Sequence, residues 1–228
     1  MTPSAAMQEY LAEAYRIAYY QGEDDPYIST SSLATVLKVS APAVTRMVQR
    51  LKEGDFLEHE PYRGIKLTEK GEKEALTNIR SHRLVERFLV DVMGFGWHEV
   101  HDAADELGAV VSEILVHRMA EMTGHPRRCP HGEPIPTIDG FMPRIIDYPL
   151  SDANDGQTYM ISRVNTHDED KLRYFDTLGI KPGAKFNFEH RAPFNGPLQI
   201  RLNKEMLHLG HELAGVLRVC TEEEFAVV

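Results

Sequence analysis

Several side chains that commonly bind metal ions occur in the middle of the chain. His82 and Glu86 lie four residues apart, so both side chains share one face of a predicted helix. His101 lies on the next predicted helix, and an antiparallel pair would bring it near that face. Cys129 and His131 are two residues apart. Imidazole, thiolate and carboxylate groups together suit a first-row divalent ion.

The pair His167–Asp168 extends this set, because it opens the loop before a predicted short helix near 170–178. Each motif alone has an ordinary explanation: a surface ion pair, a packed histidine, or a Cys-x-His pair that binds nothing. Their combination in one chain favours a metal site.

Acidic side chains form a second candidate site. Glu9 and Glu13 share a helix face, and Asp105 and Glu106 belong to another acidic group with Asp102. Like charges packed together cost energy unless a cation lies among them. A second metal site is therefore conceivable, although a solvated acidic face explains the pattern more simply.

The charge distribution points to nucleic acid although the chain is acidic. Its formal net charge is −10, yet residues 26–52 contain no Asp or Glu. About four acids would be expected over those positions at the chain average. An acid-free surface is what a phosphate backbone requires, because each carboxylate would repel it. Chance in a short window is the plainer alternative.

The helix expected to begin at Ser40 carries most of this surface. Arg46 is the best candidate for reading a guanine edge, because its fork matches two acceptors. Basic side chains such as Lys52 are better placed for phosphates, which position the protein without specifying sequence. The residues expected to contact DNA are Lys38, Ser40, Pro42, Thr45, Arg46, Gln49, Arg50 and Arg63. A merely solvated helix face remains the alternative.

The elements around this surface predict a winged helix-turn-helix. An amphipathic helix is expected over 5–20, a short one from 29–32 through Leu37, and a third from Ser40 to a stop at Gly54. Residues 56–60 and 64–67 alternate like two strands around a turn. In such a motif the second helix of the helix-turn-helix enters the major groove, and the wing touches the DNA backbone.

The remainder of the chain predicts an α+β protein with two further domains. We expect a long helix from Thr68 to about Val92 and another from about Trp97 to Met122, whose wide apolar stripe suggests a dimer interface. Six of the 13 prolines lie within 124–149, so this segment predicts a linker or an extended wrap. Short strands from about Leu150 fit a small SH3-like barrel.

Composition narrows the class of protein. Two cysteines cannot form a disulfide framework. No apolar run approaches the ~18 residues that span a bilayer, and the N-terminus lacks a signal-peptide pattern. We therefore expect a cytoplasmic protein with reduced thiols.

The sequence resembles the diphtheria-toxin-repressor (DtxR/MntR) family of metal-dependent transcriptional regulators. It looks most similar to the manganese-responsive branch, which carries a C-terminal FeoA or SH3-like domain. The residues that carry the likeness are Ser40–Val48, Tyr62–Gly64, Leu67–Thr68, Gly71, His82–Leu84, Glu86, Phe88–Leu89, Val100–Asp102, Ala104, Cys129–Gly132, Leu178–Gly183, Leu209–Gly210 and Leu213–Ala214.

The resemblance implies a homodimer that binds operator DNA when loaded with Mn²⁺ or Fe²⁺, and that represses metal-uptake genes. It implies three domains, 1–73, 74–148 and 149–228. By position, the residues that match the family's ligands for one metal site are His82, Glu86, His101, Cys129, His131 and Asp168.

The family's other metal site maps onto Glu9, Asp105, Gly108 and Ala109. Gly108 and Ala109 have no side-chain ligand atom, so this sequence departs from the family pattern there. The second site is then lost, weak, or shifted to Glu13 or Glu106.

The expected mechanism is a metal-dependent placement of two recognition helices. A cation can act only through its preference for the DNA-competent arrangement. It would also reduce the negative field of residues 82–125, which hold three basic and eight acidic residues. Two rival hypotheses remain, a metallohydrolase and a winged-helix regulator that answers a small organic ligand.

Overall fold

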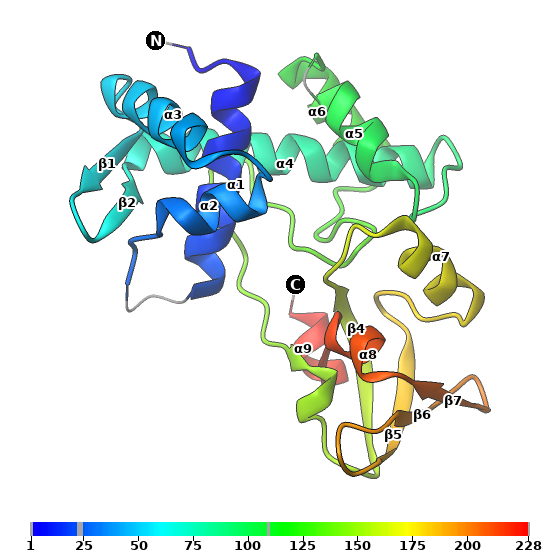
Figure 1. Cartoon of the computed structure of the whole chain (residues 1–228). Coiled ribbons are helices and arrows are strands. Elements are labelled where there is room, and N and C mark those ends of the chain that lie inside the picture. Colours follow the sequence, from blue (N-terminus) through cyan, green and yellow to red (C-terminus); the bar gives the residue numbers. More distant parts are fainter. Residues whose placement is uncertain (1, 22–24, 109, 228) are drawn as a thin grey trace. The chain divides into compact units, whose positions relative to one another are not determined.

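The computed structural model of the protein describes residues 2–21, 25–108 and 110–227. They form two compact units, Met1–Ser81 with Pro136–Met142, and His82–Ile135 with Pro143–Val228. Figure 1 shows the elements in chain order. None of the helices among the described residues has the length and apolar character needed to cross a bilayer.

The first unit is the predicted winged helix-turn-helix. Its elements are α1 (Ala5–Gln21), α2 (Thr30–Val36), α3 (Ala41–Glu53), β1 (Leu57–Glu60) and β2 (Gly64–Leu67). The two strands pair antiparallel, Leu57 opposite Leu67, and the hairpin lies beside α3 (Figure 1). The buried core side chains of this unit come from every one of these elements, and include Leu11, Leu33, Val44, Val48, Leu51, Phe56 and Ile65.

Local sequence explains where these elements begin and turn. Ser29 caps α2 by accepting a hydrogen bond from the Ser32 backbone N–H at 3.0 Å. Ser40 is the N-cap of α3, and Pro42 lies in the first turn, where a missing N–H costs little. Gly64 has φ +126°, and a Cβ there would lie 2.2 Å from the Ile28 carbonyl oxygen, so the wing requires glycine.

The long helix α4 (Glu69–Asp91) confirms the prediction for this segment. Thr68 accepts a hydrogen bond from the Gly71 backbone N–H at 3.1 Å. The helix is continuous from the end of the wing to the residues that were singled out as metal ligands.

The prediction of one helix from about Trp97 to Met122 is wrong. The structure has α5 (Val100–Gly108) and α6 (Glu113–Met122) instead. The backbone N–H groups of Val110 and Val111 both bond to the Leu107 carbonyl, which closes a turn. Ser112 then caps α6. The apolar pattern runs through the break because periodicity does not report a capped turn.

The proline-rich stretch is extended, as predicted, but its middle is not a loose linker. Arg128 and Pro134 form an isolated antiparallel bridge, and residues 129–132 and 134–136 are buried. A tight turn closes with the Gly132 N–H donating to the Cys129 carbonyl at 3.0 Å.

The C-terminal part is a six-stranded antiparallel sheet with the order β3-β8-β4-β5-β6-β7. The strands are β3 (Tyr148–Pro149), β4 (Gln157–Val164), β5 (Lys185–Arg191), β6 (Leu198–Leu202), β7 (Glu205–Leu209) and β8 (Leu217–Cys220). The helical segments are η1 (Leu150–Asp152), α7 (Glu169–Thr177), α8 (His211–Gly215) and α9 (Glu222–Ala226). Phe175, Phe186 and Phe188 are fully buried in its core, and Trp97 packs into the same cluster.

Candidate functional site

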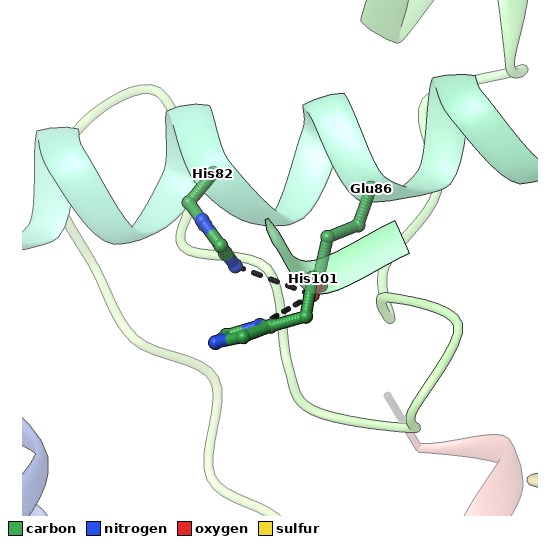
Figure 2. A group of neighbouring side chains, drawn as sticks. All are labelled: His82, Glu86 and His101. Carbon is green, nitrogen blue, oxygen red and sulfur yellow. Dashed lines mark hydrogen bonds and ion pairs between the residues drawn. The ribbon is translucent and has the colours of Figure 1, made fainter. Parts of the chain in front are cut away.

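Glu86 is the centre of the side-chain cluster in the second unit. It projects from α4, and only 2% of the residue is exposed. Its Oε1 atom lies 3.2 Å from Nε2 of His82, 3.4 Å from Nδ1 of His101 and 3.5 Å from Nδ1 of His131. Figure 2 shows His82 and Glu86 extending from one helix toward His101. The structure therefore brings together donors from α4, from α5 and from the proline-rich segment.

The spacing of these atoms fits a common cation. Two ligands that each lie about 2.1 Å from one ion are roughly 3.0–3.4 Å apart in octahedral or tetrahedral geometry. The ligand atoms of His82, Glu86 and His101 all lie within 4.8 Å of one another, as do those of Glu86, Cys129 and His131. Imidazole nitrogen, carboxylate oxygen and thiol sulfur suit Mn²⁺, Fe²⁺ or Zn²⁺.

The second ring nitrogen of each of these histidines faces an acceptor. Asp105 accepts a hydrogen bond from His82, and the distance from His82 Nδ1 to Asp105 Oδ1 is 3.1 Å. The other carboxylate oxygen of Asp105, Oδ2, lies 3.7 Å from Nε2 of His101. The Nε2 of His131 lies 2.9 Å from the carbonyl oxygen of Trp97. Such outer partners hold a ring in place and leave its inner nitrogen available as a ligand.

Charge and burial explain the protonation of this cluster. Burial acts to raise the pKa of Glu86, but hydrogen bonds from His101, His131 and His82 hold it well below its usual range. Burial disfavours the charged form of His82, yet Asp105 and Glu86 raise its pKa to about 9. For His131, Cys129 and Glu86 overcome the same burial effect and raise the pKa to about 10. A cation that binds here must displace protons.

The turn that carries Cys129 and His131 is attached to β4. Val164 donates its backbone N–H to the His131 carbonyl at 3.0 Å. Gly132 has φ +90°, and a Cβ there would lie 2.2 Å from the Ser162 carbonyl oxygen. Only glycine permits this approach. In the Cys-x-His-Gly run, the backbone therefore requires Gly132, while Cys129 and His131 supply the donor atoms.

Asp168 does not lie in the cluster. It is the N-cap of α7, where its side chain accepts from the Lys171 backbone N–H at 3.1 Å, and it is exposed. The preceding residue, His167, lies against the cluster instead: its ring stacks on His101 with centroids 3.9 Å apart. The capping preference of Asp explains the exchange. The His-Asp pair was the signal, but adjacent residues point in different directions.

The acidic residues assigned to a second site come from both units of the chain. Glu13 pairs with Arg16, and Glu9 is an exposed residue of the same helix in the first unit. Asp105 faces His82 and His101, so it belongs to the cluster around Glu86. Glu106 is exposed. Gly108 ends α5, and Ala109 lies outside the described residues.

The residues expected to contact DNA share exposure to solvent. They are Lys38, Ser40, Pro42, Thr45, Arg46, Gln49, Arg50 and Arg63. The buried stripe of α3, formed by Val44, Val48 and Leu51, holds the opposite face against the unit's core. The packing of this buried stripe therefore determines which face of α3 is exposed to solvent.

The wing orients one of these basic side chains. The Arg63 guanidinium stacks 3.9 Å above the Tyr27 ring centroid and pairs with Glu60 at 3.3 Å. The Tyr27 hydroxyl also donates to Glu60. These contacts restrict Arg63 at the wing, beside the fully exposed Tyr62.

Exposed apolar side chains concentrate around α6. Val110 is 79% exposed and Ile114 is 82% exposed, and Leu115 and Met122 are each 53% exposed. Ile114, Leu115 and Met122 follow helical spacing on one side of α6. Exposed apolar side chains gathered on one side of a helix are typical of a protein interface.

Three family models match consecutive parts of the chain. "Iron dependent repressor, N-terminal DNA binding domain" matches residues 3–65. "Iron dependent repressor, metal binding and dimerisation domain" matches residues 68–137, and the FeoA domain matches 148–219.

Individual proteins agree with these models. The iron-dependent repressor IdeR of Mycobacterium tuberculosis is 30% identical over 202 residues, which cover 82% of this chain and 86% of IdeR. The HTH-type transcriptional regulator MntR of Shouchella clausii is 34% identical over 120 residues, 48% of this chain and 81% of MntR. A solved manganese-dependent transcriptional repressor in complex with manganese superposes with a TM-score of 0.83 and 32% identity, covering 94% of this chain and 99% of that one.

Proposed function

Because this chain belongs to the family of iron- and manganese-dependent transcriptional repressors, we propose that it is a homodimer that binds operator DNA when loaded with a divalent cation. Mn²⁺ is the first candidate and Fe²⁺ the second. The proposed targets are metal-uptake genes, the role is regulatory rather than enzymatic, and the protein acts in the cytoplasm, where the DNA is. The proposal keeps the three domains 1–73, 74–148 and 149–228.

The observation that carries the metal part of this proposal is the buried cluster around Glu86. Three histidines from three segments direct one nitrogen each toward the same carboxylate oxygen. The proposed inner ligands are His82, Glu86, His101, Cys129 and His131, with Asp105 as an outer acceptor. Asp168 enters only if its cap on α7 is released.

The proposed ligands come from segments that are separated in the sequence, and a bound cation would join these segments. A bound divalent cation supplies positive charge that neutralises the Glu86 carboxylate and a Cys129 thiolate. His82 and Glu86 hold α4, His101 holds α5, and Cys129 and His131 hold the turn at 129–132. Since α4 begins immediately after the wing, the ligand-bearing helix is continuous with the DNA-binding unit.

For DNA, the proposed contacts are those of the exposed face of α3 and of the wing. Arg46 reads a base edge, and Lys38, Arg50 and Arg63 hold phosphates. A homodimer presents two such faces, which match half-sites about one or more helical turns apart. Cation binding favours the arrangement that fits both.

The test is operator binding with and without metal. A duplex selected from a random library by the Mn²⁺-loaded protein serves as the probe. We expect tight binding with Mn²⁺ and a loss of roughly tenfold or more after chelation, in line with typical coupling energies. Equal affinity of the demetallated and the loaded protein for the duplex would reject metal-dependent repression. DNA binding that does not respond to metal, but is abolished when an extract of small organic molecules is added, would favour a regulator that answers such a ligand.

A further inference from the structure

Trp97 connects the cluster around Glu86 to the core of the FeoA-like domain. It is the single tryptophan of the chain and lies in the segment between α4 and α5. Only 8% of it is exposed, although the nearby residues Val92 and Met93 are 42% and 57% exposed. Residues of this segment and of the FeoA-like domain belong to the same compact unit.

One end of Trp97 holds His131. Its carbonyl oxygen lies 2.9 Å from Nε2 of His131, and a carbonyl can only accept, so Nε2 carries the hydrogen and donates. In the neutral imidazole, Nδ1 is then the nitrogen with a free lone pair. That atom is the one 3.5 Å from Glu86 Oε1. The backbone of Trp97 therefore selects which nitrogen of His131 faces the cluster.

The other end of Trp97 is held by the FeoA-like domain. The indole packs in the cluster formed by the sheet and α7, with Phe175 and Leu172 among its members. Its Nε1–H donates to Oδ1 of Asp176 at 2.9 Å. The ring also lies 5.7 Å from the His131 ring, centroid to centroid. The position of the carbonyl is thus set by a side chain buried in another part of the fold.

We propose that Trp97 is a positioning residue: its indole, anchored on Asp176, places its carbonyl so that His131 presents Nδ1 to the metal site. This inference rests on the proposed metal site. It assigns the FeoA-like domain a part in forming that site without supplying a ligand. Outer partners of this kind change metal affinity by about 10- to 100-fold when they are removed.

The forward test compares variants that disturb the anchor to different degrees. Asp176→Leu removes one hydrogen bond on an exposed helix surface, and we expect Mn²⁺ to bind about two- to tenfold more weakly. Trp97→Leu removes the donor and much of the packing, and should weaken binding by about 10- to 100-fold. Asp176→Asn keeps an acceptor oxygen and should restore most of the affinity.

Phe56→Leu is the control for lost stability. Phe56 is fully buried, but it belongs to the separate core of the first unit, which does not include Trp97. This variant should be less stable while it keeps the wild-type Mn²⁺ affinity. The visible spectrum of the Co²⁺-loaded protein reports the ligand set directly, and it should change in Asp176→Leu and Trp97→Leu but not in Phe56→Leu.

The coupling must also act in the reverse direction. Saturation with Zn²⁺ should change the fluorescence of Trp97 in the wild type, and His131→Ala should abolish the change. Wild-type affinity and Co²⁺ spectra in both Asp176→Leu and Trp97→Leu, alongside lost binding in His131→Ala, would overturn the positioning role alone. A wild type that binds no Mn²⁺, or an unaffected His131→Ala, would instead refute the proposed metal site.

Discussion

At the scale of single residues, the cluster owes its chemistry to one buried carboxylate. Glu86 is 2% exposed, and burying a lone carboxylate would be costly without compensation. His82, His101 and His131 provide that compensation, and each has a second nitrogen directed at Asp105 or Trp97. A cation would replace the protons that now satisfy Glu86.

Glu86→Gln should therefore weaken metal binding more than the substitution of any exposed acidic residue does. An amide cannot neutralise a cation, and we expect Mn²⁺ affinity to fall by about 100-fold or more, the upper range for perturbed metal sites. Competition with a metal-sensitive dye measures this. Glu106→Gln, at an exposed position of α5, is the control and should bind as the wild type does. Equal affinities would exclude Glu86 as a ligand.

Asp105 and Asp168 should each have a role other than the one that sequence alone assigned. Asp105→Ala removes the acceptor of His82 and should weaken Mn²⁺ binding by about tenfold. Asp168→Ala removes a helix cap and should lower the free energy of unfolding by about 1 kcal/mol, with metal affinity retained. Calorimetric titration and thermal unfolding separate the two. Loss of metal from Asp168→Ala would show that the cap opens on loading.

At the scale of elements, the ligand turn is held to the sheet by buried ion pairs. Asp147 accepts from Arg163 at 2.6 Å and from Arg218 at 3.0 Å, and Arg163 also reaches Glu133 at 2.9 Å. Glu133 in turn pairs with Arg83 of α4 at 3.3 Å. This chain of charges joins α4, the segment after His131, β4 and β8.

Asp147 makes the stability of this network depend on pH. Burial acts to raise its pKa, but Arg163 and Arg218, with the Ser162 hydroxyl, lower it below the unfolded value. A depressed folded pKa contributes stability that is present above the unfolded pKa, about 3.9, and is lost as pH falls through the folded pKa. Asp147→Asn should lower the free energy of unfolding by about 3 kcal/mol near pH 7, because the buried Arg163 and the partly exposed Arg218 lose their partner.

Denaturant unfolding at several pH values tests this. The difference in free energy of unfolding between the wild type and Asp147→Asn should shrink as pH falls below about 4. Only the wild type has a carboxyl group at position 147 that takes up a proton there. Asp139→Asn, at an exposed position, should leave stability nearly unchanged at each pH. A difference that stays constant down to pH 2 would contradict the ionic role of Asp147.

The recognition helix α3 supports a prediction about DNA sequence preference. Arg46→Ala should lower affinity for the selected duplex by about 1–3 kcal/mol and relax the preference at one base pair. Arg50→Ala should weaken binding to all duplexes alike and reduce the salt slope by about one. Affinity measured over a series of duplexes and salt concentrations distinguishes them. Uniform loss in Arg46→Ala would reassign that residue to the backbone.

At the scale of the whole molecule, the proposed function requires two copies of the chain. The family model that covers residues 68–137 describes a dimerisation domain, and the exposed apolar residues of α6 lie within it. A homodimer would present two copies of α3 to one operator, whose half-site spacing mirrors the twofold symmetry.

Ile114→Glu should therefore convert the protein to a monomer. A charge on an 82% exposed apolar side chain is harmless in the free chain but unfavourable in a desolvated interface. Sedimentation equilibrium should show the loss of the dimer, together with weaker operator binding. Phe194→Glu, at a fully exposed aromatic side chain of the β5–β6 loop, is the control and should remain dimeric. A dimer that survives in Ile114→Glu would place the interface elsewhere.

Local sequence was sufficient for the DNA-binding unit, because its signals act over a few residues. Apolar spacing predicted α1 and α3, residues 29–32 and Ser40 marked helix starts, and the alternating residues 56–60 and 64–67 marked the wing. The acid-free stretch 26–52, which covers α3 as far as Lys52, was equally visible, since exposure on a short amphipathic helix follows from its periodicity. The sequence alone was less reliable for α5 and α6, where a capped turn interrupts one apolar pattern.

The sequence by itself determined the donor types of the candidate metal site and the spacing of His82, Glu86, Cys129 and His131. Only the tertiary structure decided that Asp105 faces this cluster, that Asp168 caps α7 and that Trp97 orients His131. The physical reason is that a residue's type sets what it can bind, while long-range packing sets where its atoms point. The Trp97 carbonyl is placed by an indole buried against residues 50 or more positions away, and no local pattern encodes that contact.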